Sequence, residues 1–172
     1  GTKYCYKIDI RKYYPSVDLN ILYAYFERHV ADKDALWLIH KVIYSHDKGL
    51  PIGNFTSQWF ANLYLSGFDW WVRQTLGVKY YVRYIDDIVL LHGNKRELHD
   101  MRRAIEDRLR NCYHLAIKAD WQVFRVDGRG VDFLGYRFFH GHTVIRKRTA
   151  YRIARKIREI GTHVRCSLSD AS

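Results

Sequence analysis

Hydrophobic and polar residues alternate in some stretches of the chain, whereas in others apolar residues return every three or four positions. Residues 4–10 alternate, which predicts a β-strand with Asp9 near its carboxyl end. Apolar residues at helical spacing follow Asp18 and again follow Asp32, so two amphipathic helices are expected, each with its aspartate as the N-cap. This part of the chain therefore predicts one strand followed by two helices.

The loop at residues 47–56 holds two glycines and a proline, and a further helical pattern follows it. We expect that helix to begin with Thr56 or Ser57 as its cap and to continue to about Gly77. Unpaired amides at a helix start can bind phosphate or approach a base pair, so the loop is a candidate binding element. A tight connection between two core helices is the alternative.

Two apolar, β-branched-rich runs within residues 79–91 flank Asp86 and Asp87, which predicts a β-hairpin with the two aspartates at its tip. Adjacent strand residues point to opposite faces, so both carboxylates can serve one site only where the backbone turns. Like charges this close repel each other unless a metal ion or a basic group compensates them. The pair is thus a candidate cation site, and an Asp-rich turn is the alternative.

The remainder of the chain predicts a helix and several short strands. Asn94 is expected to cap an amphipathic helix, and residues 115–117 and 121–126 are expected to form strands. Residues 131–139 are predicted to form one arm of a further hairpin that turns near Gly141. The order of these elements is typical of an α+β fold with a ferredoxin-like βαββαβ antiparallel sheet packed on helices.

In such a sheet Asp9 and the hairpin tip lie on neighbouring strands, so the carboxylates of Asp9, Asp86 and Asp87 meet. Three acidic side chains provide the oxygen ligands that two Mg²⁺ ions need, at about 3.5–4 Å separation, for in-line phosphoryl transfer. One ion activates the attacking hydroxyl and the other stabilises the leaving phosphate. We therefore expect a two-metal site, with Mn²⁺ able to substitute for Mg²⁺.

The charge of the chain favours a polyanionic partner. Its 172 residues include 29 Lys and Arg against 18 Asp and Glu, a net charge of +11, so nucleic acid is the leading candidate. No apolar run reaches the roughly 20 residues that a membrane-spanning helix needs. The three cysteines lack Cys-x-x-Cys spacing, which argues against a disulfide framework and a zinc site. We expect a cytoplasmic protein without a membrane partner.

From Arg146 onward the composition becomes basic, and isoleucines at helical spacing predict a helix. The residues expected to contact a nucleic-acid backbone are Arg146, Lys147, Arg148, Arg152, Arg155 and Lys156. An ordinary solvated surface helix is the alternative.

Five segments resemble, in order, the motifs of reverse transcriptases. Residues 7–18 (KIDIRKYYPSVD) are similar to motif A, residues 49–58 to motif B, and residues 84–87 (Tyr-Ile-Asp-Asp) to the Tyr-x-Asp-Asp motif C. Lys118 falls where motif D supplies a basic residue, and residues 133–136 resemble the primer grip. The resemblance therefore covers nearly the whole chain.

The resemblance implies an RNA-directed DNA polymerase that uses an RNA template, a DNA primer and deoxynucleoside triphosphates. It implies that Asp9, Asp86 and Asp87 are catalytic and that these three and Ile10 bind the metal ions. Tyr14 would be the steric gate that excludes a 2′-hydroxyl, with a core aromatic as the alternative. The other implied residues are Ile52, Gly53, Ser57, Gln58 and Lys118 in the nucleotide and template pocket, and Phe133, Leu134, Gly135 and Tyr136 in the primer grip.

An aliphatic Ile52 before the motif B glycine, followed by Ser57 and Gln58, resembles the enzymes of diversity-generating retroelements. That likeness implies an error-prone polymerase, since an aliphatic side chain cannot hydrogen-bond the sugar of the nucleotide. By the same resemblance, residues 1–145 would be the palm (motifs A to E) and residues 146–172 the start of a basic helical thumb. The fingers are expected to be absent, the fragment alone poorly active, and the protein bacterial or phage-encoded, with an accessory protein left open.

Other functions are compatible with parts of this pattern. A catalytically silent nucleic-acid-binding module would keep the palm fold, but three mutually repelling carboxylates argue against it. A group II intron maturase or a phage-defence reverse transcriptase would carry the same motifs. A nucleotidyl cyclase also has a palm-like core, but its Gly-Gly-Asp/Glu-Glu-Phe turn is missing from the sequence.

Overall fold

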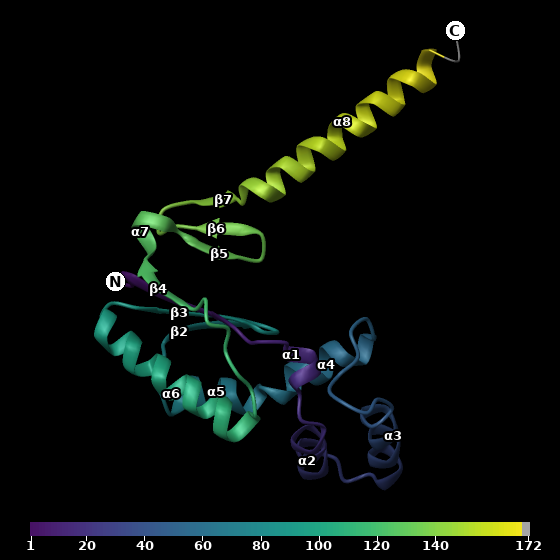
Figure 1. Cartoon of the computed structure of the whole chain (residues 1–172), viewed down its shortest axis with the longest axis vertical. Helices are drawn as coiled ribbons and strands as arrows, with labels where there is room; N and C mark the ends of the chain where they lie inside the picture. The colour runs from purple at the N-terminus through teal and green to yellow at the C-terminus, as the bar shows by residue number, and fades with distance from the viewer. Residues whose placement is uncertain (170–172) are drawn as a thin grey trace. The chain divides into compact units, whose positions relative to one another are not determined.

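The alternating residues near the start of the chain form strand β1 (Tyr4–Asp9), which belongs to a four-stranded sheet (Figure 1). The other strands are β2 (Tyr80–Tyr84), β3 (Asp87–His92) and β4 (Gln122–Arg125), in the order β2-β3-β1-β4. Strand β3 runs antiparallel to both β1 and β2. The predicted α+β fold is confirmed, with the first strand beside the hairpin.

The structure, a computed structural model, describes the backbone of residues 1–169 and the side chains of residues 1–160. Two units form the chain, residues 1–124 and residues 125–172. The predicted boundary between residues 145 and 146 lies inside the second unit.

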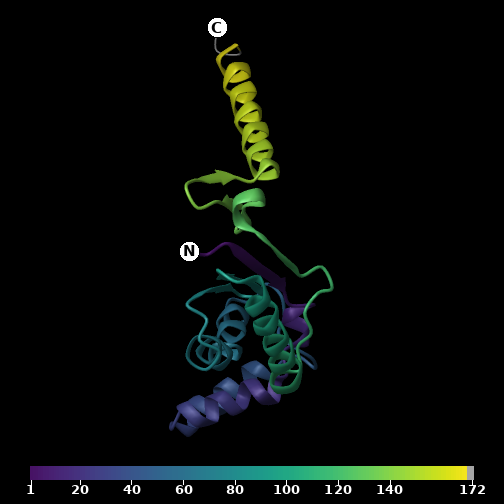
Figure 2. The ribbon, with the colours of Figure 1, turned by 90° about the vertical axis from the view of Figure 1, so that its left-hand side faces the viewer.

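The first unit contains six helices as the structure describes it. They are α1 (Tyr13–Ser16), α2 (Leu19–His29), α3 (Lys33–Ile43), α4 (Phe55–Tyr64), α5 (Ser66–Gln74) and α6 (Lys95–Tyr113). The predicted caps are confirmed: Asp18, Asp32 and Asn94 each accept hydrogen bonds from backbone amides of the first turn. Helix α2 packs against α3 and α4, and α6 packs against β1 and β3 (Figure 2).

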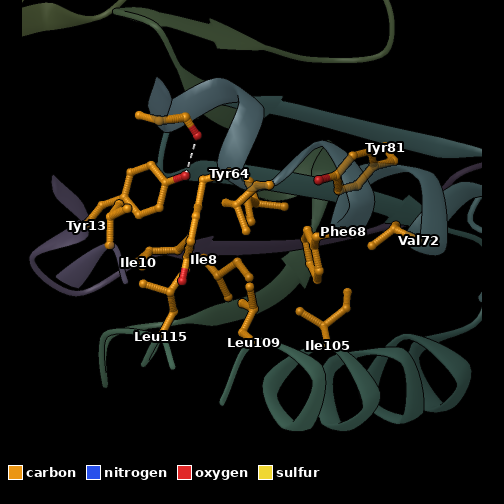
Figure 3. Packing of buried hydrophobic residues seen from close by; sticks show 14 of the residues in the cluster. Ile8, Ile10, Tyr13, Tyr64, Phe68, Val72, Tyr81, Ile105, Leu109 and Leu115 are labelled. Atoms are coloured by element: carbon orange, nitrogen blue, oxygen red, sulfur yellow. Dashed lines mark hydrogen bonds between the residues drawn. The ribbon is translucent and has the colours of Figure 1, made fainter. Parts of the chain in front are cut away.

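The core of the first unit lies between one face of the sheet and the helices α5 and α6 (Figure 3). Ile8 of β1, Phe68 of α5, and Ile105 and Leu109 of α6 are fully buried there. Each such side chain stabilises the fold by about 1.5–3 kcal/mol. On β2 the alternate residues Tyr80, Val82 and Tyr84 are exposed, so the opposite face of this strand stays open.

The single helix predicted from Thr56 or Ser57 to Gly77 is wrong in two respects. It is divided into α4 and α5, and it begins earlier than predicted. Leu65, which is fully buried, lies between α4 and α5, and the Ser66 hydroxyl donates to the carbonyl oxygen of Leu63 at 2.7 Å. A serine that bonds a nearby carbonyl offers the backbone an alternative to continuing the helix. Neither Thr56 nor Ser57 is the cap: Asn54 occupies that position without a side-chain bond, and both residues lie inside α4.

The second unit contains a three-stranded antiparallel sheet and a long basic helix. Its elements are α7 (Val126–Arg129), β5 (Val131–Phe133), β6 (Tyr136–Phe138), β7 (Thr143–Ile145) and α8 (Lys147–Ser169). The single arm predicted for residues 131–139 is wrong, because the chain reverses at Leu134 and Gly135, whose φ angles are 50° and 86°. Of the strand predicted at residues 115–117, one bridge between Ile117 and Ile10 is formed.

Candidate active site

Three aspartates lie at one end of the four-stranded sheet. Asp9 is the last residue of β1 and Asp87 the first residue of β3, and the two are paired directly across the strands. Residues opposite each other in an antiparallel pair carry their side chains on the same face, with Cβ atoms about 4.5–5.5 Å apart. The carbonyl oxygen of Asp86 accepts a bond from the Ile10 amide at 3.1 Å, so Asp86 lies beside the end of β1.

The turn before these aspartates has an unusual backbone. Ile85 has φ 57°, in the left-handed region that a β-branched residue rarely adopts. This conformation reverses the chain between β2 and β3, which ends one strand at Tyr84 and starts the next at Asp87. The neighbouring carboxylates therefore lie at a turn, as the sequence predicts.

Asp86 lies in an environment that disfavours its charged form. Burial raises the pKa of Asp86 above its ordinary value, and the negative charges of Asp9 and Asp87 raise it further. Lys118 acts in the opposite direction. A carboxyl group with a raised pKa that lies beside other carboxylates is a candidate member of a functional site.

Two lysines compensate the remaining aspartates. The Nζ atom of Lys118 lies 2.7 Å from Oδ1 of Asp9, and Nζ of Lys7 lies 3.2 Å from Oδ2 of Asp87. The amide of Lys118 also donates to the carbonyl oxygen of Asp9 at 2.9 Å, and the hydrogen bond to Asp9 raises the pKa of Lys118. Lys7 is not among the residues predicted from the sequence, although strand alternation places it two positions before Asp9 and on the same face.

The donor chemistry of this site fits a hard divalent cation, because carboxylate oxygens are the ligands that Mg²⁺ prefers. The side chains themselves form two ion pairs. Within the described residues, no group of three or more His, Cys, Asp or Glu side chains is gathered closely enough to hold a metal ion. A cation held by Asp9 and Asp87 would take the place of Lys118 and Lys7 as their positive partners.

Tyr14 lies half-buried near this end of the sheet. Burial raises the pKa of its hydroxyl, and the nearby charges of Asp86 and Tyr84 raise it further. The preceding Tyr13 is the core aromatic: it is 2% exposed, and its hydroxyl donates to the carbonyl oxygen of Ala61 at 2.5 Å. Tyr14 is thus the more accessible of the two rings.

The loop before α4 is held against the backbone of α1. The amide of Leu50 donates to the carbonyl oxygen of Tyr14 at 2.8 Å, and a Cβ at Gly49 would lie 2.6 Å from Cα of Pro15. Only glycine permits so close an approach together with φ +64°. This contact joins the segment similar to motif B to the segment similar to motif A.

The other residues predicted for the nucleotide and template pocket differ in accessibility. Ile52 is 81% exposed in the loop, and Gly53, with φ +102°, has open space where a Cβ would lie. Ser57 is 2% exposed within α4, whereas Gln58 is exposed. Lys118 is the member of this set that contacts a carboxylate.

The predicted primer-grip residues form a tight hairpin in the second unit. Phe133 ends β5, Leu134 and Gly135 make the turn, and Tyr136 begins β6. Leu134 is 51% exposed and Tyr136 is 48% exposed. The tip of this hairpin therefore presents apolar surface to solvent.

A basic groove lies beside the start of α8. It has a volume of about 570 Å³ and is lined by Arg146, Arg148, Thr149, Tyr151, Arg152 and Arg155. Arg146 lies 3.7 Å from Asp132, and Arg155 lies 3.5 Å from Glu159. Four arginines around one groove provide a surface suited to phosphate groups. Lys147 and Lys156, also predicted to contact nucleic acid, are exposed on α8.

No helix in the described part of the chain is both long enough and apolar enough to span a membrane.

Solved structures with a similar fold include fungal telomerases. No curated protein sequence matches the chain. Apo telomerase from Candida tropicalis, truncated from its C-terminal domain, superimposes with a TM-score of 0.60 at 13% identity, over 83% of this chain and 34% of that chain. Apo telomerase from the same organism superimposes with a TM-score of 0.66 at 12% identity, over 80% of this chain and 31% of that chain. Telomerase from Candida albicans in complex with a fragment of telomeric RNA superimposes with a TM-score of 0.58 at 12% identity, over 80% of this chain and 30% of that chain.

These structures show a shared fold, and this chain spans about a third of each telomerase chain. The family model for reverse transcriptase (RNA-dependent DNA polymerase) matches residues 1–138. That range contains all three aspartates, the loop before α4, Lys118 and the β5–β6 hairpin. The chain therefore belongs to the reverse transcriptase (RNA-dependent DNA polymerase) family.

Proposed function

We propose that this chain carries the catalytic palm of an RNA-directed DNA polymerase, with Asp9, Asp86 and Asp87 as its catalytic residues. The observation that supports this most directly is the pairing of Asp9 with Asp87 across β1 and β3, with Asp86 held beside them by the Ile10 amide. In this proposal the three aspartates and Ile10 bind two Mg²⁺ ions, for which Mn²⁺ can substitute. The substrates are deoxynucleoside triphosphates, added to a DNA primer on an RNA template.

Two divalent ions, when bound, supply activation of the attacking hydroxyl and stabilisation of the leaving group. The protein residues hold and orient the charges around them. Lys7 and Lys118 compensate Asp87 and Asp9 at 3.2 and 2.7 Å, and both must release these carboxylates when cations bind. Tyr14 is proposed as the steric gate for the sugar; it is half-buried and close enough to Asp86 for that charge to raise the Tyr14 pKa.

The pocket for the nucleotide and template is proposed to include Ile52, Gly53, Ser57 and Gln58 at the start of α4. Ile52 is exposed and aliphatic, so it offers packing and no hydrogen bond to a substrate. This composition supports an error-prone polymerase, and a place among the diversity-generating retroelement enzymes remains part of the proposal.

The second unit is proposed to contact the primer and the nucleic-acid duplex. The exposed hairpin tip at Leu134 and Tyr136 would touch the primer, and the arginine-lined groove beside α8 would bind phosphates. Helix α8 begins at Lys147, which supports a palm at residues 1–145 and the start of a thumb at residues 146–172. The proposal leaves open whether an accessory protein takes part.

The test is primer extension on an RNA template by the longest natural polypeptide that contains these residues. Asp9→Asn and Asp86→Asn should each reduce extension by at least about 10³-fold, because each removes a carboxylate charge that would hold the divalent cations. Asp100→Asn is the matched control, since Asp100 is an exposed residue of α6 that pairs with Arg103. Extension by either active-site variant at the parental rate would contradict the assignment.

The ion pairs of Asp9 and Asp87 with lysines favour one competing function, a catalytically silent module that binds nucleic acid. Titration with Mn²⁺ separates the two. A polymerase palm should bind Mn²⁺ and lose that binding in Asp9→Asn, whereas a silent module should bind nucleic acid and no Mn²⁺.

A further inference from the structure

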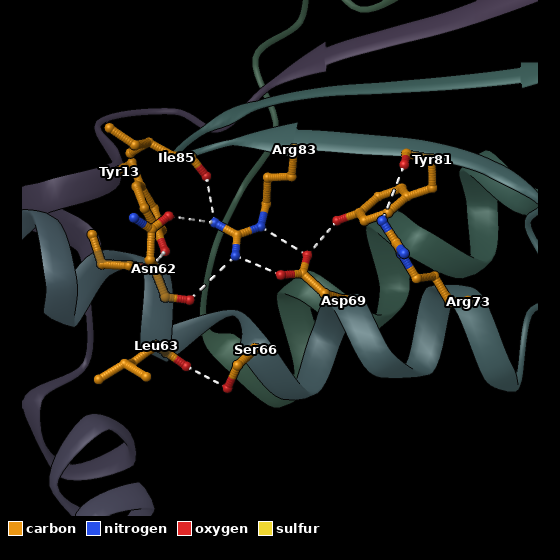
Figure 4. A network of polar contacts seen from close by, with 10 residues as sticks. Tyr13, Asn62, Leu63, Ser66, Asp69, Arg73, Tyr81, Arg83 and Ile85 are labelled. Atoms are coloured by element: carbon orange, nitrogen blue, oxygen red, sulfur yellow. Dashed lines mark hydrogen bonds and ion pairs between the residues drawn. The ribbon is translucent and has the colours of Figure 1, made fainter.

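Arg83 is a buried charged residue whose guanidinium group bonds three separate segments of the first unit (Figure 4). It lies in β2, and its side chain is 7% exposed. Nε and Nη2 donate to the two carboxylate oxygens of Asp69 in α5, at 2.8 and 2.5 Å. Nη1 donates to the carbonyl oxygen of Ile85 at 3.0 Å, and Nη2 donates to the carbonyl oxygen of Asn62 in α4 at 3.2 Å.

The pair of Arg83 with Asp69 keeps this buried charge in place. Burial disfavours the charged guanidinium, but the hydrogen bonds and the negative charge of Asp69 outweigh that effect and raise the pKa of Arg83. The hydroxyl of Tyr81 donates to the same carboxylate at 2.5 Å, which fixes Asp69 in turn. A planar fork with five donors can hold a carboxylate on one edge and bond carbonyl oxygens with its remaining N–H groups.

The carbonyl oxygen that Arg83 binds belongs to the strained residue of the aspartate turn. Ile85 has a left-handed backbone, and such a conformation persists only where neighbouring groups determine it. Arg83 fixes the turn from the β2 side, and the bond from the Ile10 amide to the Asp86 carbonyl oxygen fixes it from the β1 side. Both bonds end on backbone carbonyl oxygens of the turn that carries Asp86 and leads into Asp87.

We propose that Arg83 is a positioning residue that holds the turn at Ile85, so that Asp86 and Asp87 face Asp9. Through Asn62 it also ties this turn to α4, the helix that follows the Ile52–Gly53 loop. The inference rests on the proposed function, because it assigns to Arg83 the alignment of the carboxylates for cation binding. In this proposal Arg83 acts through the turn and has no contact with substrate or metal.

The first test measures amide hydrogen exchange in Arg83→Lys. Lysine keeps the charge next to Asp69, but a compact ammonium on a flexible stem cannot also hold the Ile85 and Asn62 carbonyl oxygens. Exchange at residues 85–88 should become about tenfold faster or more, the change that corresponds to losing one charge-assisted hydrogen bond. Exchange at the centre of β3 should change little.

Two further variants make this test specific. Arg73→Lys is the matched control, because Arg73 donates to the Tyr81 carbonyl oxygen at 3.4 Å and lies over the Tyr81 ring; it should leave exchange at the turn unchanged. Asp69→Asn keeps the Arg83 guanidinium but weakens its pairing with residue 69, so it should accelerate exchange at the turn by less than Arg83→Lys does. It decides the question if Arg83→Lys does not fold. Unchanged exchange at the turn, or equal acceleration throughout the unit, would overturn the inference.

The second test measures Mn²⁺ binding by calorimetry with the whole chain. Misaligned carboxylates should weaken the affinity of Arg83→Lys by about tenfold while the stoichiometry stays the same. A merely destabilised protein would instead lose stoichiometry at unchanged affinity. If the parental chain binds no Mn²⁺, the proposed metal site fails, and the exchange measurement still decides whether Arg83 holds the turn.

Discussion

Replacing Gly49 by alanine should destabilise the chain much more than the same change at Gly77. Both glycines have a left-handed backbone, with φ +64° and +68°, and an L-residue in this conformation costs about 1–2 kcal/mol. The surroundings differ. At Gly49 the new Cβ would lie 2.6 Å from both Cα of Pro15 and the carbonyl oxygen of Tyr14, whereas at Gly77 no atom lies within 4 Å.

The clash at Gly49 involves backbone atoms, so no side-chain rotation relieves it. The loop must move away from α1, which lengthens or breaks the 2.8 Å bond from the Leu50 amide to the Tyr14 carbonyl oxygen. Overpacking costs about 1–3 kcal/mol, and a lost hydrogen bond costs about 0.5–1.5 kcal/mol. We therefore expect a loss of roughly 3–6 kcal/mol for Gly49→Ala and about 1–2 kcal/mol for Gly77→Ala.

Urea unfolding followed by tryptophan fluorescence measures both losses under the same conditions. The transition midpoint should shift while its slope with denaturant stays constant, which shows that stability has changed and the unfolded state has not. Equal losses for the two variants would refute the reasoning, because the close contact with α1 would then have no energetic consequence.

The other predictions concern one acid, the basic helix and the nucleotide pocket. Hydrogen bonds from His114 and two backbone amides outweigh burial and lower the pKa of Asp18. The stabilisation of the fold by ionised Asp18 should therefore be present above about pH 4 and be lost as the pH falls. In urea unfolding, the difference in stability between the parental protein and Asp18→Asn should shrink below that pH. Replacing Arg152, Arg155 and Lys156 by glutamine should reduce the slope of log affinity for a duplex against log salt concentration by up to about 3. An unchanged slope would show that α8 is an ordinary solvated surface helix. Ile52→Gln should lower the frequency of copying errors by about three- to tenfold, measured by sequencing the products made on one template. Equal error spectra for the two enzymes would show that Ile52 does not affect fidelity.

Local patterns predicted most of the first unit correctly. Strand alternation located β1 with Asp9 at its end, and the apolar runs around Asp86 and Asp87 located the hairpin. The helix starts at Asp18, Asp32 and Asn94 were also predictable, because a cap is formed by residues adjacent in sequence. These features depend on the chain within a few residues.

The errors arose where local patterns allow more than one backbone path. Helical periodicity continues through Leu65, and only packing of that buried residue and the Ser66 bond divide α4 from α5. Apolar and aromatic residues also continue on both sides of Gly135, although the chain reverses at Leu134 and Gly135. A tight turn and a continued strand share the same composition over so short a stretch.

The sequence by itself therefore determined which residues are proposed to carry the chemistry, since three aspartates in recognisable motifs are visible without coordinates. Only the tertiary structure decided how they are held. The pairing of Lys7 with Asp87 joins residues that are 80 positions apart, and the bonds of Arg83 join β2 to α4 and α5. Such contacts follow from strand register and helix packing, which depend on the whole fold, and no local pattern of polar and apolar residues encodes them.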